Sequence, residues 1–176
     1  MNKARIWTGD YVYAVGIGSN RALSHRLGPR AIVRASFAAL DEAPLTLVAR
    51  SPVIATRPLG PSARTYANAA ALVSTPLPPL AMLDRLQAIE HRFHRRRYRR
   101  WGARTLDLDL LLWSGGPVQS KRLTVPHPAL RARAFVLTPL RTIAPGWRDP
   151  ITGRTIAQLA AQLAKPKPVD RTRRAL

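Results

Sequence analysis

Apolar segments of two kinds alternate along the chain, and their order restricts the folds open to it. Four segments are short and β-rich, as strands are, and two repeat their apolar residues at the spacing of a helix. In chain order these are strands at 11–17, 45–56, 66–75 and 106–113 and helices at 29–40, after the first strand, and 80–93, before the last. The order β-α-β-β-α-β predicts the α+β class, specifically a ferredoxin-like two-layer sandwich with an antiparallel sheet and helices on one face.

The residues that follow the last of these strands predict extra C-terminal elements. We expect a short strand at 121–123 and helices at 135–143 and 156–163. The end of the chain is rich in Pro, Lys and Arg, a composition typical of a disordered tail. We therefore divide the chain into an N-terminal extension, one folded domain and a basic tail, at 1–10, 11–163 and 164–176.

The balance of charge indicates an anionic partner. Lys and Arg together number 29 and Asp and Glu only 9, so the formal net charge is +20. Such a surface attracts a phosphate-rich small molecule, a nucleic acid or an acidic protein. The absence of cysteine excludes a disulfide scaffold, a thiolate zinc site and a cysteine nucleophile. No apolar run approaches the ~18 residues of a transmembrane helix, and no signal peptide is recognisable, so we expect a cytoplasmic protein.

Two of the few carboxylates lie close together in the last predicted strand. Asp107 and Asp109 alternate with Leu106, Leu108 and Leu110. In a strand, residues two apart share a face, so the leucines point to the core and the two carboxylates point away from it. Neighbouring carboxylates repel each other unless a cation lies between them, and oxygen ligands without His or Cys suit Mg²⁺. The alternative is a pair of solvated carboxylates bridged to nearby arginines.

An arginine-rich segment comes directly before this strand. Residues 91–104 contain seven Arg, two His and three aromatic residues. Arginines in such number need an anion to gather them, and their planar groups fit phosphate oxygens. Next to a metal-binding carboxylate pair, they predict phosphoryl transfer. The alternative is a nucleic-acid surface with interleaved aromatic residues.

Several nucleotide-binding motifs are missing from the chain. The G-x-x-x-x-G-K-[ST] motif, the full dinucleotide-binding glycine pattern and the protein-kinase residue set do not occur. We therefore expect side chains to hold any bound nucleotide.

Residues 100–111 read RWGARTLDLDLL, and this segment closely resembles the RWGPRTLDLDLL signature of the 6-hydroxymethyl-7,8-dihydropterin pyrophosphokinase family. Further short matches fall in the family's order from about residue 11 to residue 163. They read GSN at 18–20, TRPLG at 56–60, YAN at 66–68, QAIE at 87–90, RLTVPH at 122–127 and RAF at 133–135. The family has the ferredoxin-like fold predicted above. Ala103 departs from the family's usual proline, which makes the entry into the last strand less rigid.

The resemblance implies transfer of a diphosphate from ATP to the hydroxymethyl group of the pterin, with release of AMP, in folate biosynthesis. In the family, two Mg²⁺ ions bridge the ATP phosphates and are held by the carboxylates that match Asp107 and Asp109. One of the ions also contacts the pterin hydroxyl and lowers its pKa. The partners implied are ATP and the pterin, with no membrane and no specific nucleic acid, and we expect a monomer.

The resemblance also assigns roles to single residues. Pterin-binding positions match Thr56, Leu59, Tyr66, Asn68, Trp101 and Phe135, with Tyr66 and Phe135 stacking on the flat ring. ATP-binding positions match Gln87, Glu90, Arg95, Arg104, Arg122, Thr124, His127 and Arg133. Catalytic positions match Arg95, Arg104, Asp107 and Asp109. Because the arginine-rich segment allows several registers, Arg96 or Arg97 could take the role given to Arg95.

Each assigned residue also has an ordinary structural explanation. Tyr66 and Phe135 could be core aromatics, Asn68 could cap a turn, and Glu90 could be a charge on a helix surface. The alternative function is a basic ferredoxin-like RNA-binding module. The aromatic pattern of RNA-recognition sheets is absent, however, and a carboxylate pair on a central strand would repel RNA phosphates.

Overall fold

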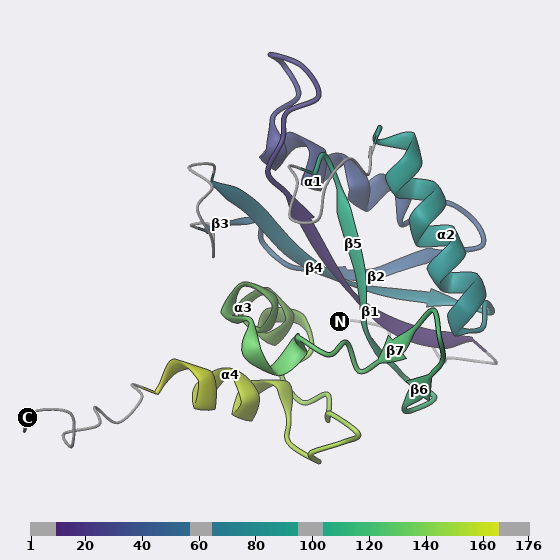
Figure 1. The fold of residues 1–176 in the computed structure, drawn as a ribbon, viewed down its shortest axis with the longest axis vertical. Coiled ribbons are helices and arrows are strands. Elements are labelled where there is room, and N and C mark those ends of the chain that lie inside the picture. Colours follow the sequence, from purple (N-terminus) through teal and green to yellow (C-terminus); the bar gives the residue numbers. More distant parts are fainter. Residues whose placement is uncertain (1–9, 57–64, 95–103, 166–176) are drawn as a thin grey trace, which may run out of the picture.

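The computed structural model describes residues 10–56, 65–94 and 104–165 of the chain. Its strands and helices follow one another in the order that the sequence predicts, with additions at the C-terminal end (Figure 1). In chain order they are β1 (Tyr11–Ser19), α1 (Pro29–Ala39), β2 (Thr46–Arg50), β3 (Ile54–Thr56), β4 (Tyr66–Thr75), α2 (Pro79–Arg92), β5 (Asp107–Trp113), β6 (Val118–Gln119), β7 (Thr124–Val125), the 3-10 turn η1 (Leu130–Ala132), α3 (Ala134–Ile143) and α4 (Ile156–Ala164).

The main sheet is antiparallel, with its strands in the order β2-β4-β1-β5. β3 pairs with the first residues of β4, next to the stretch of β4 that pairs with β2. This arrangement confirms the predicted ferredoxin-like fold. Strands β1 and β4 lie at the centre, so their backbone groups have partners on both sides.

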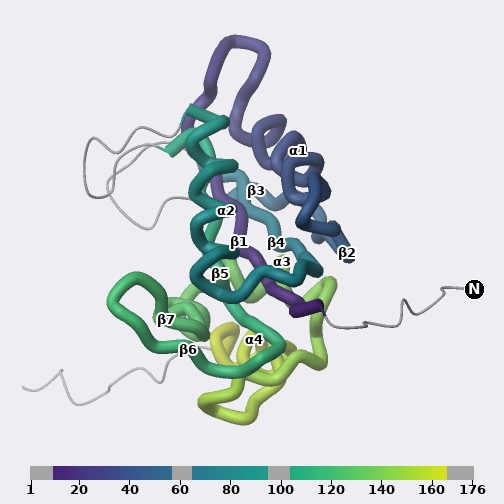
Figure 2. Tube along the Cα trace, turned by 90° about the vertical axis from the view of Figure 1, so that its right-hand side faces the viewer, coloured from purple at the N-terminus to yellow at the C-terminus, as the bar shows by residue number. Residues whose placement is uncertain are grey.

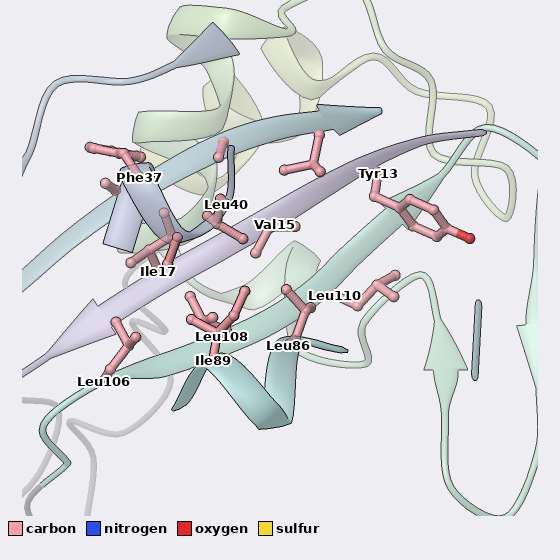
Figure 3. Close-up of a cluster of buried hydrophobic side chains, with 14 of the residues drawn as sticks. Tyr13, Val15, Ile17, Phe37, Leu40, Leu86, Ile89, Leu106, Leu108 and Leu110 are labelled. Carbon is pink, nitrogen blue, oxygen red and sulfur yellow. The ribbon is translucent and has the colours of Figure 1, made fainter. Parts of the chain in front are cut away.

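One face of the sheet is covered by α1 and α2, as predicted. The side chains of this core come from alternate residues of the strands and from the apolar faces of the two helices. Figure 3 shows them meeting between the sheet and the helices. The sheet side contributes Tyr13, Val15, Ile17, Leu108 and Leu110, with Leu106 just before β5, and the helical side contributes Phe37, Leu40, Leu86 and Ile89. The predicted orientation of the β5 leucines is therefore confirmed.

The opposite face is partly covered by the C-terminal helices α3 and α4, which the sequence predicted without placing them. Ala14, Ala70, Leu111 and Leu112 pack there against apolar residues of both helices. A bulge lies in β5 opposite Ala14 and Val15, so two consecutive leucines, Leu111 and Leu112, reach this second core. The sheet thus has helices on both faces, whereas the β-α-β-β-α-β pattern by itself predicts helices on one (Figures 1 and 2).

Two of the strand predictions need correction. The predicted strand 45–56 is broken into β2 and β3 at Ser51 and Pro52. Proline has no N–H for the ladder, and the Ser51 side chain instead accepts a hydrogen bond of 2.9 Å from the Ala70 backbone N–H. The extra C-terminal strand expected near 121–123 is present but displaced, as β6 and β7 on either side of these residues. Residues 121–123 form the turn of this hairpin, which Ser120 closes by accepting a hydrogen bond of 3.0 Å from the Leu123 backbone N–H.

The helix predictions are confirmed to within one or two residues. α1 and α2 each have proline in the first turn, where a missing N–H costs nothing. α4 begins with a capping box between Thr155 and Gln158. None of the helices in the described part of the chain has the length and hydropathy that crossing a bilayer requires. Nearly all of the predicted extension 1–10 and tail 164–176 lies outside the described residues.

A buried ion pair fastens the segment before α4 to η1. The side chain of Asp149 is fully buried and accepts two hydrogen bonds of 2.7 Å from Arg131. It also accepts hydrogen bonds from the Thr152 hydroxyl at 2.6 Å and the Ile151 N–H at 3.1 Å. Burial alone would raise the pKa of Asp149, but these hydrogen bonds outweigh it and lower the pKa to about 2.

We predict that Asp149→Asn lowers the free energy of unfolding at pH 7 by about 2–3 kcal/mol, because it leaves Arg131 without its carboxylate. Since the folded-state pKa lies below the unfolded value of ~3.9, this stabilisation is present above pH ~4 and is lost as the pH falls toward 2. Urea unfolding at pH 7 and pH 3 measures both effects.

The matched control is Asp84→Asn, which removes a carboxylate paired with arginine on the surface. It should cost less than about 1 kcal/mol, as exposed ion pairs do. Equal losses of unfolding free energy in the two variants would contradict the stabilising role given to the buried Asp149–Arg131 ion pair.

Candidate active site

The two carboxylates of β5 lie on the sheet face opposite α1 and α2, beyond the area that α3 covers. Asp107 pairs across the ladder with Gly18 of β1, and Gly18 pairs in turn with Asn68 of β4. Asp109 pairs in the same way with Gly16. Because directly paired residues project from the same face of a sheet, Asn68, Gly18 and Asp107 form one row across three strands. Residues far apart in the sequence thus form the floor of a single site.

Asn68 is held in place by the neighbouring strand. Its side chain is only 5% exposed, and its Nδ2 donates a hydrogen bond of 2.6 Å to the Thr56 hydroxyl in β3. Tyr66 lies opposite Thr56 in the ladder and two residues before Asn68, so it leaves the sheet on the same side as Asn68. The structure therefore brings together three of the predicted pterin-binding residues.

Phe135 reaches this side of the sheet from the first turn of α3, a helix that packs on β4. It is half-buried at the edge of the second core. The guanidinium carbon of Arg133, the residue that precedes α3, lies 5.7 Å from the centre of the Phe135 ring. This is cation–π distance, so an arginine predicted to bind phosphate rests on an aromatic ring predicted to bind pterin.

Arg104 is fixed at the entrance to β5 by its backbone as well as its side chain. Its Nη1 lies 2.5 Å from the Asp107 carboxylate. Its backbone N–H donates to the Asn20 side chain at 2.7 Å, and its carbonyl accepts from the backbone N–H groups of Asn20 and Arg21. Asn20 is almost fully buried. Asn20 belongs to the GSN match at 18–20, but its structural role depends on a contact 84 residues away in the chain, which the sequence does not reveal.

The surroundings of Asp109 change the pKa of its carboxyl group. Burial and the neighbouring charge of Asp107 raise the pKa of Asp109, and the nearby His127, Arg133 and Arg104 offset only part of this rise. These three basic residues therefore lie within electrostatic range of the carboxylate pair. A partly buried carboxylate beside a second carboxylate is stabilised in its charged form by a cation placed between them.

Two predicted ATP-binding residues lie on α2. Glu90 is not a surface charge: it is 1% exposed, and its Oε1 accepts a hydrogen bond of 2.7 Å from the backbone N–H of Leu108. Leu108 stands between Asp107 and Asp109, so Glu90 supports the strand that carries both carboxylates. Gln87 lies one turn earlier in α2 and is half-buried.

The remaining predicted ATP-binding residues of the described chain follow β5. The guanidinium of Arg122, in the β6–β7 turn, forms an ion pair with Asp84 of α2. Thr124 is in β7. The backbone N–H of His127 donates to Leu111 of β5 at 3.0 Å, and its Nδ1 accepts from the Ala129 N–H at 3.1 Å. His127 is therefore tied to the strand that carries the carboxylates.

Three predicted site residues, Leu59, Arg95 and Trp101, lie outside the described residues, as do Arg96, Arg97 and Ala103. Among the residues that are described, no group of three or more His, Cys, Asp and Glu is placed to hold a metal ion. Asp107 and Asp109 supply two carboxylates on one face, and oxygen ligands of this kind suit Mg²⁺.

A carboxylate pair with Arg104, Arg133 and His127 within electrostatic range supplies the charged groups that phosphoryl transfer uses to position and neutralise phosphates. The family model of 7,8-dihydro-6-hydroxymethylpterin-pyrophosphokinase matches residues 14–145. The chain belongs to this family.

Relatives of the chain carry the same description. Proteins called 2-amino-4-hydroxy-6-hydroxymethyldihydropteridine pyrophosphokinase are 45% identical over 107 residues in Synechocystis sp. and 45% identical over 149 residues in Pseudomonas aeruginosa. The matches cover 61% of this chain and 55% of the Synechocystis protein, and 84% of this chain and 88% of the Pseudomonas protein.

The fold is also found in a solved structure of greater sequence divergence. The Plasmodium falciparum HPPK-DHPS protein, crystallised with pteroate, aligns with a TM-score of 0.67 and 13% identity, over 87% of this chain and 42% of that one. The chain thus spans little more than half of the Synechocystis relative and less than half of the Plasmodium protein. The likeness to the Plasmodium protein shows the fold alone.

Members of the family are ATP-dependent diphosphotransferases that move a pyrophosphoryl group from ATP to hydroxymethyldihydropterin in folate biosynthesis. The predicted resemblance is therefore confirmed. The alternative of a basic RNA-binding module finds no support among these matches.

We predict that Asp109→Asn raises the melting temperature of the metal-free protein at pH 7, because it removes a charge that burial and Asp107 disfavour. Since the folded-state pKa is raised, the unfolded chain releases this proton at a lower pH than the folded protein does. The carboxylate therefore costs stability as the pH rises above ~4. A gain of about 2–4 °C corresponds to ~1 kcal/mol in a chain of this size.

Thermal unfolding in a chelator between pH 4 and pH 7 measures this gain, which should shrink toward pH 4. Asp41→Asn is the control, since Asp41 is exposed and accepts a hydrogen bond from the Leu47 N–H outside the site. A lower melting temperature for Asp109→Asn at pH 7 would contradict the electrostatic description of the pair.

Proposed function

We propose that this chain catalyses the reaction of its family, the transfer of diphosphate from ATP to the hydroxymethyl group of 6-hydroxymethyl-7,8-dihydropterin with release of AMP. The observation that carries the proposal is the row formed by Asn68, Gly18 and Asp107. In this row, the Asn68 amide can bind the polar edge of the pterin, and the Asp107 carboxylate nearby can bind a cation that carries the ATP phosphates. The diphosphate donor and its acceptor can then meet over one sheet.

Asp107 and Asp109 are the residues that hold the metal in this proposal. Their fit is supported by their common face, their mutual repulsion and the raised pKa of Asp109, which a divalent cation would relieve. We assign two Mg²⁺ ions, bound together with ATP. Bound there, the ions would neutralise the triphosphate and favour loss of the proton from the pterin hydroxyl to solvent water. Arg104 keeps Asp107 in a fixed orientation, and Glu90 supports the strand between the two carboxylates.

The pterin lies between Tyr66 and Phe135 in our proposal, since flat rings stack well on aromatic faces. Thr56 accepts from the Asn68 Nδ2, which leaves the Asn68 Oδ1 to accept N–H groups from the heterocycle. Leu59 and Trp101 complete this pocket as predictions from the sequence. The enclosed ring places its hydroxymethyl arm toward the carboxylate pair.

The ATP side is assigned to polar and basic groups around that pair. Arg104, Arg133 and His127 lie close enough to lower the pKa of Asp109, so we assign the phosphates to the space near these three basic residues. Arg122 and Thr124 extend this side along the β6–β7 hairpin. Gln87 and Glu90 belong to α2, on the other face of the sheet, so the buried Glu90 acts on this site through its hydrogen bond to β5. Arg95 remains a prediction from the sequence. The hydroxymethyl oxygen attacks the β-phosphorus, the bond from that phosphorus to the oxygen of the α-phosphate breaks, and AMP departs. The expected monomeric state and cytoplasmic location belong to the same proposal.

We predict that Asp107→Asn and Asp109→Asn each lower the rate of pterin-dependent AMP release by at least about 100-fold at saturating Mg²⁺, because each removes a charged metal ligand. Chromatographic quantitation of AMP in the presence and absence of the pterin measures this rate. Circular dichroism should show that both variants remain folded.

Asp41→Asn, which changes a carboxylate outside the site, should keep wild-type turnover. Near-normal turnover in either of the first two variants would rule out the metal assignment. An absence of AMP release from the wild-type protein with both substrates would rule out the proposed reaction.

A further inference from the structure

Gly18 occupies the middle of the site, in the central strand of the sheet. It pairs directly with Asn68 on one side and with Asp107 on the other. A methyl group at this position would lie 3.4 Å from the Asn68 Oδ1 and 3.8 Å from the Asp107 Cβ. A side chain at position 18 would therefore stand between the residue assigned to the pterin and the residue assigned to the metal.

The fold itself gives no reason for glycine at position 18. The φ angle of Gly18 lies outside the left-handed region that favours glycine. The two contacts that a methyl group would make are of ordinary van der Waals length. Glycine weakens the interior of a strand, so alanine would be expected here if stability alone determined the residue.

At two other glycines near this sheet, close packing explains why the residue is glycine. A methyl group at Gly16 would approach the Leu111 side chain to 3.2 Å, which is closer than side chains normally come. A methyl group at Gly115 would overlap the ring of Trp113. Packing within the protein accounts for both of these glycines, but it does not account for Gly18.

We propose that Gly18 is a specificity-determining residue, whose missing side chain leaves room for the substrate to cross the sheet. This inference rests on the proposed function. The ring of the pterin is read at Asn68 and its hydroxymethyl oxygen reacts beside Asp107, so the arm that joins them passes over position 18. The bare backbone of β1 lets this arm lie close to the sheet, and a side chain would lift it away from the phosphates.

The test compares Gly18→Ala and Gly18→Val with wild-type protein in calorimetric titrations. Each protein is titrated with a non-hydrolysable ATP analogue and Mg²⁺, and then with 6-hydroxymethyl-7,8-dihydropterin. We expect the Kd for the pterin to rise about 10- to 100-fold in Gly18→Ala and further in Gly18→Val, which is the range for one misplaced methyl group in a pocket. The Kd for the ATP analogue should change less than about twofold, and the melting temperature should stay the same or rise.

Gly146→Ala is the matched control, because a methyl group there meets nothing within 4 Å and the residue lies outside the site. It should leave both affinities unchanged. An unchanged pterin affinity in Gly18→Ala would overturn the inference while the proposed function stood. A marked loss of stability in both Gly18 variants would also overturn it, since the glycine would then serve the fold. Failure of the wild-type protein to bind the pterin would overturn the inference together with the proposed function.

Discussion

The antiparallel pairing of β1 with β4 and β5 is the constraint on which the rest of the molecule depends. It aligns Gly18 with Asn68 and Asp107, and it decides which face of the sheet each residue joins. A slip of one residue would move the carboxylates into the α1–α2 core and the leucines into the site. Burial of Leu106, Leu108 and Leu110 beneath the helices therefore fixes the position of the chemistry as well as stabilising the fold (Figure 3).

The candidate site holds like charges close together, although they repel each other. Two carboxylates are held side by side on one strand, and burial adds to the repulsion at Asp109. The protein offsets this with Arg104 on Asp107 and with surrounding basic residues, and it secures the strand from behind through Glu90. Such an arrangement disfavours the charged form of Asp109 in the ligand-free protein, and a cation beside the pair would relieve this, as the proposed metal-binding role requires.

Much of the fold could be predicted from the pattern of apolar residues, because the short β-rich runs of β1, β4 and β5 and the helical spacing in α1 and α2 reflect burial directly. The break at Ser51 and the turn at 121–123 could not, since each depends on a side chain replacing a backbone partner. In the site, the common face of Asp107 and Asp109 followed from spacing within one strand. The role of Asn20 depends on Arg104, which lies before β5, and the role proposed for Gly18 depends on partners in the two neighbouring strands. A glycine inside an apolar strand was the available sequence signal for Gly18. The buried position of Glu90 likewise depends on how α2 packs against β5.

The helices α3 and α4 cover only part of the second face, and the boundary of that cover falls within single strands. β4 changes from core to site between Ala70 and Asn68, and β5 does so between Leu111 and Asp109. Stability and chemistry are consequently interleaved along one ladder instead of being assigned to separate elements. Whether a substitution disturbs stability or chemistry depends on which face of the sheet the side chain joins and on how far the residue lies from α3.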